Sequence, residues 1–188
     1  MKILVFDNYD SFTYNLVHCI EKAGTYEVEV HRNDKISLSE IARFDKILLS
    51  PGPGLPSEAG ILHELVRTYA PLKDIFGVCL GQQAIAEVFG GSLRNLEDVY
   101  HGVATEMEIT QKDLLFEGMP SRFKAGRYHS WVVDEAGFPA ELEVTARDSK
   151  GYIMALRHKT YKVRGVQFHP ESILTEEGDR IIRNWLES

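Results

Sequence analysis

Short apolar segments rich in β-branched residues alternate with amphipathic segments along the first half of the chain. A brief apolar run that stops at a polar residue or glycine is typical of a buried strand, whereas apolar residues spaced by three and four indicate a helix. Such alternation predicts a parallel sheet with helices on both faces. The predicted strands are 2–6, 26–30, 46–50 and 75–79, and the predicted helices are 12–23, 59–70 and 80–90.

The second half of the chain contains more strand-like segments than helical ones. No internal repeat, low-complexity tract or linker interrupts the 188 residues. We therefore expect an α/β fold in a single domain, 1–188, with a mostly parallel central sheet flanked by helices and an additional β-rich portion. The strand-like segments are 102–110, 142–148, 152–158 and 163–169, and a last helix is expected at 176–187.

Composition narrows the classes of function. The net charge of −7 is spread along the chain, which argues against a nucleic-acid partner. Neither Cys19 nor Cys79 lies in a zinc-binding pattern, and so few cysteines fit a reducing compartment. No apolar stretch approaches the ~20 residues that span a bilayer, and the run between Lys2 and Asp7 is too short for a signal peptide. We expect a cytoplasmic protein without a membrane segment or bound metal.

Cys79 ends a predicted strand and precedes a predicted helix. In open α/β sheets, ligands bind beyond the carboxyl ends of the strands. Gly77 and Gly81 flank the cysteine at two residues on each side, as in the sharp turns that expose the nucleophile of many hydrolases. A helix N-terminus favours a thiolate, and the Leu80 amide could face charge developing on a carbonyl oxygen. The alternative is a buried structural cysteine, which is the interpretation we favour for Cys19.

A cysteine nucleophile needs a base within hydrogen-bond reach. His169 ends a strand-like segment, as Cys79 does, so parallel neighbouring strands would bring the two together. Pro170 follows, and Glu171 would point the same way as His169 in an extended segment, so it could orient the imidazole. Alternatively, the segment is only a turn with a solvated Glu171. The other histidines lie in predicted helices, after strand-like segments, or in predicted loops: His18 and His63, His31 and His158, His101 and His129.

The segment SPGPGLPSEAG, 50–60, resembles a phosphate-binding loop but lacks the required lysine and glycine spacing. Pro53 has no N–H group, so Gly52 and Gly54 hold the usable amide donors. A stiff turn at a strand end could supply half of an oxyanion hole. A purely structural turn is the alternative.

Five segments, taken together and in order, resemble the motifs of class I, triad-type glutamine amidotransferases. The first segment is similar to the opening of the glutaminase subunits (component II) of anthranilate synthase and aminodeoxychorismate synthase. The resemblance covers essentially the whole chain. The segments are FDNYDSFTYNLV, SPGPGLPSEAG, GVCLGQQAIAEVFGG, GRYHSWVV and GVQFHPESILTEEG.

This resemblance implies a role for each candidate residue. Cys79 would attack the side-chain amide of L-glutamine, His169 would transfer the proton, and Glu171 would orient the imidazole. The Leu80 amide, together with Gly52 or Gly54, would form the oxyanion hole. Many relatives have Leu where this chain has Trp131, so a ring in the pocket could alter glutamine affinity. The glutamine-binding residues implied are Gly52, Pro53, Gly54, Gln83, Ser130 and Trp131.

The resemblance also implies a partner. Ammonia would pass through a channel to a separate chorismate-using synthase subunit (component I) in a heterodimer or heterotetramer. Magnesium is expected on that partner, and no cofactor is expected in this chain. Anthranilate synthase, in tryptophan biosynthesis, is the favoured assignment, and aminodeoxychorismate synthase, in folate biosynthesis, or a subunit shared by both is the alternative. Another ammonia acceptor, a non-catalytic regulatory relative, and a cysteine peptidase or γ-glutamyl hydrolase fit the motifs less well.

Overall fold

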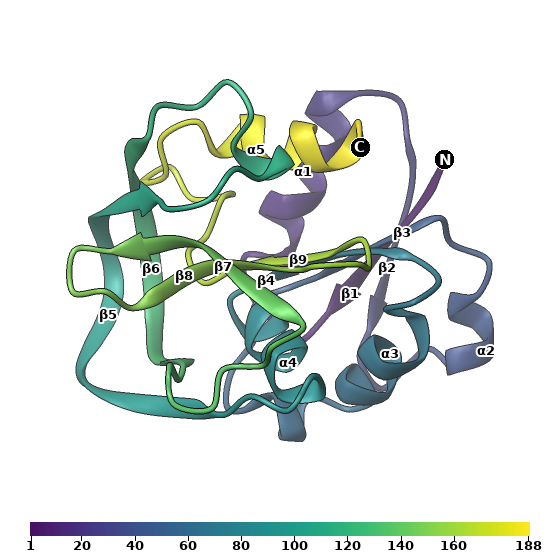
Figure 1. Ribbon diagram of the computed structural model, residues 1–188. Helices are drawn as coiled ribbons and strands as arrows, with labels where there is room; N and C mark the ends of the chain where they lie inside the picture. Colours follow the sequence, from purple (N-terminus) through teal and green to yellow (C-terminus); the bar gives the residue numbers. More distant parts are fainter.

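One nine-stranded sheet forms the centre of the computed structural model, which describes all 188 residues (Figure 1). The strand order across the sheet is β2-β1-β3-β4-β9-β8-β7-β5-β6. The strands are β1 (Lys2–Asp7), β2 (Glu27–Arg32), β3 (Lys46–Leu49), β4 (Asp74–Val78), β5 (Leu93–Ile109), β6 (Arg122–Val133), β7 (Leu142–Asp148), β8 (Ile153–His158) and β9 (Val163–Val166).

Helices connect the parallel strands, as the alternating pattern predicts. None of them is long and apolar enough to cross a membrane. The α-helices are α1 (Thr13–Ala23), α2 (Leu38–Ile41), α3 (Leu62–Tyr69), α4 (Leu80–Val88) and α5 (Gly178–Leu186), and the short 3₁₀ turns are η1 (Pro56–Glu58) and η2 (Leu114–Phe116).

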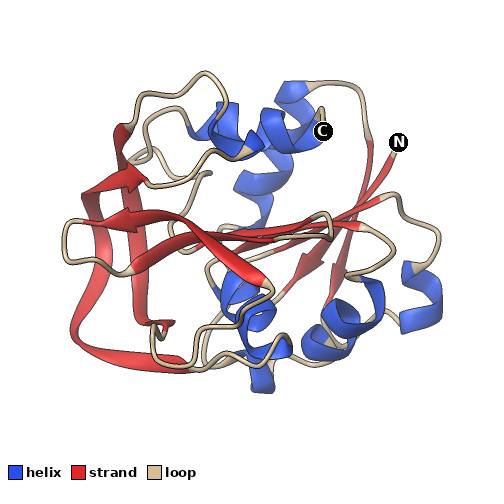
Figure 2. Cartoon of the chain, in the orientation of Figure 1, coloured by secondary structure: helices blue, strands red, loops and turns tan.

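The sheet is parallel from β2 to β9 and antiparallel from β9 to β6. The β-rich second half therefore extends the same sheet, which curls away from the helical layers in Figure 2. β4 and β9 are parallel neighbours, with Gly77 opposite Gly165 and Val78 opposite Val166. This pairing confirms the predicted parallel neighbours, and it brings the segments that carry Cys79 and His169 to the same edge of the sheet.

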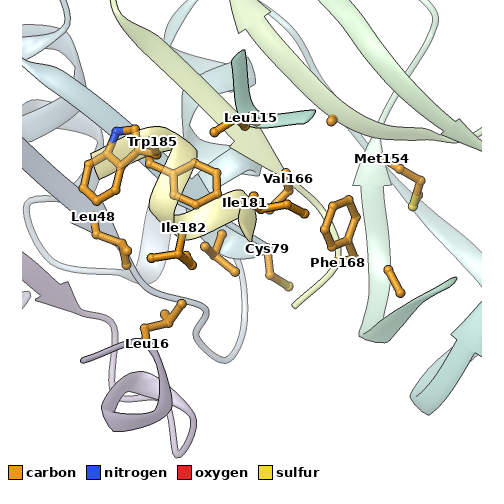
Figure 3. Packing of buried hydrophobic residues seen from close by; sticks show 14 of the residues in the cluster. Leu16, Leu48, Cys79, Leu115, Met154, Val166, Phe168, Ile181, Ile182 and Trp185 are labelled. Carbon is orange, nitrogen blue, oxygen red and sulfur yellow. The ribbon is translucent and has the colours of Figure 1, made fainter. Parts of the chain in front are cut away.

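Two apolar cores cover the two faces of the parallel strands. Successive β1 residues alternate between them: Ile3 and Val5 belong to one core, and Leu4 and Phe6 to the other. Helices α1 and α5 pack on the first face, and α2, α3 and α4 on the second (Figure 1). Figure 3 shows Cys79 among the side chains of the first core, between Ile182 and Phe168.

The structure differs from the sequence-based prediction most clearly in β5 and β6. β5 begins at Leu93 rather than near residue 102, and the sequence does not predict β6. His101 and His129 therefore lie in strands, not in loops. Most β5 side chains are exposed and the β5–β6 pairing contains two register shifts, so the sequence has little of the apolar alternation that marks a strand.

Smaller differences concern the helix starts. α1 starts at Thr13 rather than at residue 12, because Phe12 occupies the N-cap position, without a side-chain cap. The Asp10 carboxylate accepts a hydrogen bond from the Phe12 amide at 2.8 Å, in the turn that precedes the helix. α3 starts at Leu62 rather than near residue 59, and the four-residue α2 is not predicted by the sequence.

Candidate active site

Cys79 occupies a sharp turn between β4 and α4. Its φ of 53° and ψ of −101° are rare for a residue other than glycine. The Cys79 amide donates to the Val166 carbonyl oxygen at 2.8 Å, and its carbonyl accepts from the Gln83 amide at 3.1 Å. The adjoining strand and helix thus hold a strained backbone at the nucleophile position, as is common at functional sites.

The glycines around Cys79 are required by close backbone approaches. A Cβ atom on Gly77 would lie 2.5 Å from the Gly81 carbonyl carbon, and one on Gly81 would lie 2.8 Å from Leu49. These contacts explain the glycines two residues before and after the cysteine. The sequence analysis missed Gly165 of β9, where a Cβ atom would lie 2.8 Å from Cβ of Gln82.

His169 and Glu171 form a buried pair. Nδ1 of His169 lies 2.7 Å from Oε1 of Glu171, and the two side chains are 2% and 0% exposed. The backbone conformation that brings the two side chains together differs from the predicted extended segment, because β9 ends at Val166 and the chain then turns. The Ser172 amide closes that turn on the His169 carbonyl at 3.2 Å. The turn agrees with the alternative interpretation, but the solvated Glu171 that accompanied it is excluded by burial.

The environment of His169 favours the imidazolium that forms when Cys79 gives up its proton. Burial lowers the pKa of the imidazole, but hydrogen bonding to Cys79 and Glu171 and the negative charges of the thiolate and the carboxylate outweigh this effect and raise it to about 10. The buried Nε2 atom makes no hydrogen bond. Since Glu171 holds Nδ1, Nε2 is the ring atom left for proton exchange.

Two aromatic rings, which the sequence analysis did not single out, flank the imidazole. The ring centroids of Phe12 and Tyr128 lie 5.7 Å and 4.8 Å from that of His169, both in edge-on arrangements. The His169 amide donates to the Gly126 carbonyl at 3.0 Å, which ties the backbone to β6. Phe12 and Tyr128 both lie in segments that carry the family resemblance. Nothing else in the sequence indicated that they would lie beside the histidine.

All six predicted glutamine-binding residues border one cavity together with Cys79. The cavity has a volume of about 250 Å³. Two further residues of β6, Tyr128 and His129, complete its wall. Cys79 and Gln83 both face this space, as their spacing of one helical turn predicts. The lining residues are Gly52, Pro53, Gly54, Cys79, Gln83, Tyr128, His129, Ser130 and Trp131.

The 50–60 loop packs directly against the cysteine turn. A Cβ atom on Gly52 would lie 2.6 Å from Cβ of Asn8 and 2.9 Å from Cδ2 of Leu80. Gly54 has a φ of +70°, which favours glycine. The amides of Leu80, Gly52 and Gly54 donate no hydrogen bond within the chain. All three predicted oxyanion donors are therefore free to bind a ligand.

Cys19 has a different environment from Cys79. It is half-buried on α1, where burial raises the pKa of its thiol to about 12. A thiol that stays protonated at neutral pH is a poor nucleophile, in agreement with a structural role.

Nowhere in the chain do three His, Cys, Asp or Glu side chains gather closely enough to hold a metal ion.

The fold and the site define an α/β protein with a cysteine of the nucleophile type beside a buried histidine–carboxylate pair. Residues 4–188 match the family model described as glutamine amidotransferase class-I. The chain therefore belongs to the class I glutamine amidotransferase family, and the expectation from the five motifs is confirmed at the level of the family and the fold.

Individual relatives agree with this assignment. The chain is 45% identical over 189 residues to anthranilate synthase component 2 of Porphyra purpurea, covering 99% of both chains. It is 46% identical to the aminodeoxychorismate/anthranilate synthase component 2 of Bacillus subtilis, covering 99% of this chain and 96% of that protein. A solved structure from Thermoplasma acidophilum, described as one subunit of a GMP synthase, superposes with a TM-score of 0.89 at 26% identity, covering 100% of this chain and 92% of that one.

Proposed function

We propose that the chain is the glutaminase subunit of anthranilate synthase, which hydrolyses L-glutamine and passes ammonia to a synthase subunit. The carrying observation is the strained Cys79 turn beside the buried His169–Glu171 pair, at the edge of a cavity lined by the predicted glutamine-binding residues. This arrangement supports acyl transfer through a covalent cysteine intermediate.

The reaction begins at the Cys79 thiol. His169 takes the thiol proton on Nε2, and the sulfur forms a bond to the side-chain amide carbon of glutamine. As the tetrahedral intermediate collapses, the C–N bond breaks and the proton on Nε2 leaves with ammonia. A γ-glutamyl thioester remains. Water then adds to it, giving one proton to His169, and the C–S bond breaks, which releases glutamate and returns the proton to sulfur.

Charge develops on the amide oxygen in both steps. The proposed donors are the Leu80 amide at the start of α4 and the amide of Gly52 or Gly54, none of which is engaged within the chain. Glu171 stabilises the imidazolium formed while Nε2 carries the proton. Gln83, Ser130 and Trp131 line the same cavity and are the proposed contacts of the glutamine substrate.

A partner that takes up ammonia is part of this proposal, because ammonia released into water at neutral pH becomes non-nucleophilic ammonium. A second, polar cavity of about 540 Å³ adjoins Glu171 and Ile173. The Ile173 side chain is fully exposed, and Tyr9, beside the 50–60 loop, is 46% exposed. Exposed apolar residues around a site are typical of a docking surface. The proposed partner is a chorismate-using synthase carrying magnesium, in a cytoplasmic heterodimer or heterotetramer.

The names of the relatives support this pathway. The Porphyra purpurea relative carries only the anthranilate name, whereas the Bacillus subtilis relative carries both names. The second candidate is therefore a component 2 of aminodeoxychorismate synthase, or a subunit shared by the two synthases.

The test combines the purified chain with each candidate chorismate-using synthase, chorismate, magnesium and glutamine. A parallel reaction replaces glutamine with an ammonium salt, and Cys79→Ser is run beside the wild-type chain. Anthranilate is followed by its fluorescence, and aminodeoxychorismate by chromatography. We expect anthranilate from the wild-type chain with glutamine, and from both chains with ammonium.

Each other outcome has a defined meaning. Aminodeoxychorismate alone would assign the chain to the second synthase, and both products would make it a shared subunit. If neither product forms with glutamine and Cys79→Ser changes nothing, the glutaminase proposal is wrong.

A further inference from the structure

The Cys79 sulfur has a second polar neighbour besides the histidine–carboxylate pair. Nε2 of Gln167 lies 3.4 Å from Sγ of Cys79. Gln167 is 0% exposed, and its backbone amide donates to the Met154 carbonyl at 2.8 Å, so its position is set by β8. A buried amide directed at a reactive sulfur calls for a chemical explanation, because burying a polar side chain costs free energy unless it is hydrogen-bonded.

The direction of this amide follows from its neighbours. The Trp131 carbonyl oxygen can only accept hydrogen bonds, so Gln83 presents its NH₂ group there, at 3.0 Å. The same NH₂ group lies 3.2 Å from Oε1 of Gln167. Gln167 therefore uses its oxygen toward Gln83, and its NH₂ group is the part that faces Cys79. The sulfur receives a donor, and a flipped amide would break two hydrogen bonds.

The Trp131 carbonyl oxygen accepts a second hydrogen bond, from His129, and the buried Arg127 guanidinium fixes the direction of that bond. Nε of Arg127 lies 3.1 Å from Nε2 of His129, and a guanidinium can only donate. His129 must therefore accept on Nε2 and carry its proton on Nδ1, which donates to the Trp131 oxygen at 2.9 Å. Asp148 holds Arg127 in place at 2.7 Å. The carbonyl thus has both of its lone pairs engaged.

We propose that Gln167 is a further catalytic residue of the glutaminase reaction, because its side-chain amide donates to the Cys79 sulfur and stabilises the thiolate. This inference rests on the proposed function. The thiolate exists twice in the reaction, when Nε2 of His169 has taken the thiol proton and when the C–S bond of the thioester breaks toward sulfur. A donor held 3.4 Å from Sγ stabilises both states, and Gln83 and Trp131 are the positioning residues that fix its direction.

The experiment measures how fast iodoacetamide alkylates Cys79 as a function of pH, in the full chain with Cys19→Ala. Gln167→Leu removes the donor, and Gln167→Glu keeps the shape but replaces the donor with an acceptor. Gln82→Leu is the matched control, since Gln82 is also 0% exposed but has no hydrogen-bond partner for its amide. Thermal unfolding of every variant verifies that it is folded.

We expect the alkylation midpoint to rise by about one pH unit or more in Gln167→Leu, and further in Gln167→Glu, because a hydrogen bond to a charged group is lost. In Gln82→Leu the midpoint should stay at the wild-type value. With the synthase partner, kcat for glutamine should fall about tenfold or more in Gln167→Leu at an unchanged KM.

Equal midpoints in Gln167→Glu, Gln82→Leu and the wild-type chain would overturn the inference. If Gln167→Leu does not fold, Gln167→Glu decides by itself, since it has nearly the same volume. Failure of the proposed function gives a different result: the wild-type chain with its partner would release no glutamate from glutamine, whatever the alkylation midpoints are.

Discussion

Nδ1 of His169 lies 2.7 Å from Oε1 of Glu171, although only one residue separates them in the chain. Both side chains are buried, so solvent does not screen the contact. The turn after β9 produces this geometry, and the Thr175 hydroxyl donates to the His169 carbonyl at 2.6 Å to hold it. The pair therefore has the orientation that a base beside Cys79 requires.

Replacing the carboxylate tests this relationship. Glu171→Gln keeps the volume but removes the charge that supports an imidazolium, so kcat for glutamine should fall by about a hundredfold or more. The measurement is glutamate release in the presence of the synthase partner. Glu64→Gln, on the exposed face of α3, is the control and should keep wild-type activity. Retained activity in Glu171→Gln would show that the carboxylate only packs against the histidine.

His129 should make the free energy of unfolding depend on acid pH. Burial, with a further contribution from Arg127, lowers the pKa of His129 to about 3. The unfolded chain, in which the pKa is about 6.5, binds one more proton between these values. Stability is therefore fully present above about pH 6.5 and falls toward pH 3, by up to about 1.4 kcal/mol per pH unit.

His129→Asn isolates this contribution. Its side-chain NH₂ group can still donate to the Trp131 carbonyl, but it does not titrate. Denaturant unfolding between pH 4 and pH 7 should show a smaller loss of stability at the acid end in His129→Asn than in the wild-type chain. Parallel pH dependences in the two proteins would mean that His129 is protonated in the folded state.

The close packing of α4 on β3 predicts the effect of a single methyl group. Gly81→Ala would place Cβ 2.8 Å from the Leu49 side chain and carbonyl oxygen, so the helix and the Cys79 turn must shift. We expect a loss of about 1–3 kcal/mol of stability and most of the glutaminase activity. Gly137→Ala, at a positive φ but in open space, should cost about 1 kcal/mol and keep activity. Equal activities in the two variants would contradict the steric explanation.

Trp131 is the departure from the family pattern, and its backbone carries the contacts seen in the structure. The Trp131 carbonyl accepts from both Gln83 and His129, and a change of side chain leaves that carbonyl in place. Trp131→Leu should therefore change the KM for glutamine by less than about threefold, which corresponds to under ~0.7 kcal/mol. Steady-state kinetics with the partner measure it. A tenfold change would place the indole ring in the glutamine pocket.

The local patterns of the chain determined the parallel part of the fold and the identity of the candidate residues. The apolar runs that end at Asp7 and Cys79 indicated buried strands. A continuous apolar run places apolar side chains on both faces of the strand, so both faces must be packed against other parts of the protein. The G-x-C-x-G spacing marked the cysteine turn, since a sharp turn requires small neighbours. These are properties of neighbouring residues, which a sequence shows directly.

Contacts between distant segments were decided only by the tertiary structure. The exposed, bulged β5–β6 pair has little apolar alternation, so its pairing depends on contacts made across the sheet. The donor that Gln167 directs at Cys79 depends on Trp131 of β6 and Gln83 of α4, two residues far apart in the chain. Sequence spacing shows which residue types can react, whereas the direction of a buried hydrogen bond depends on every group packed around it.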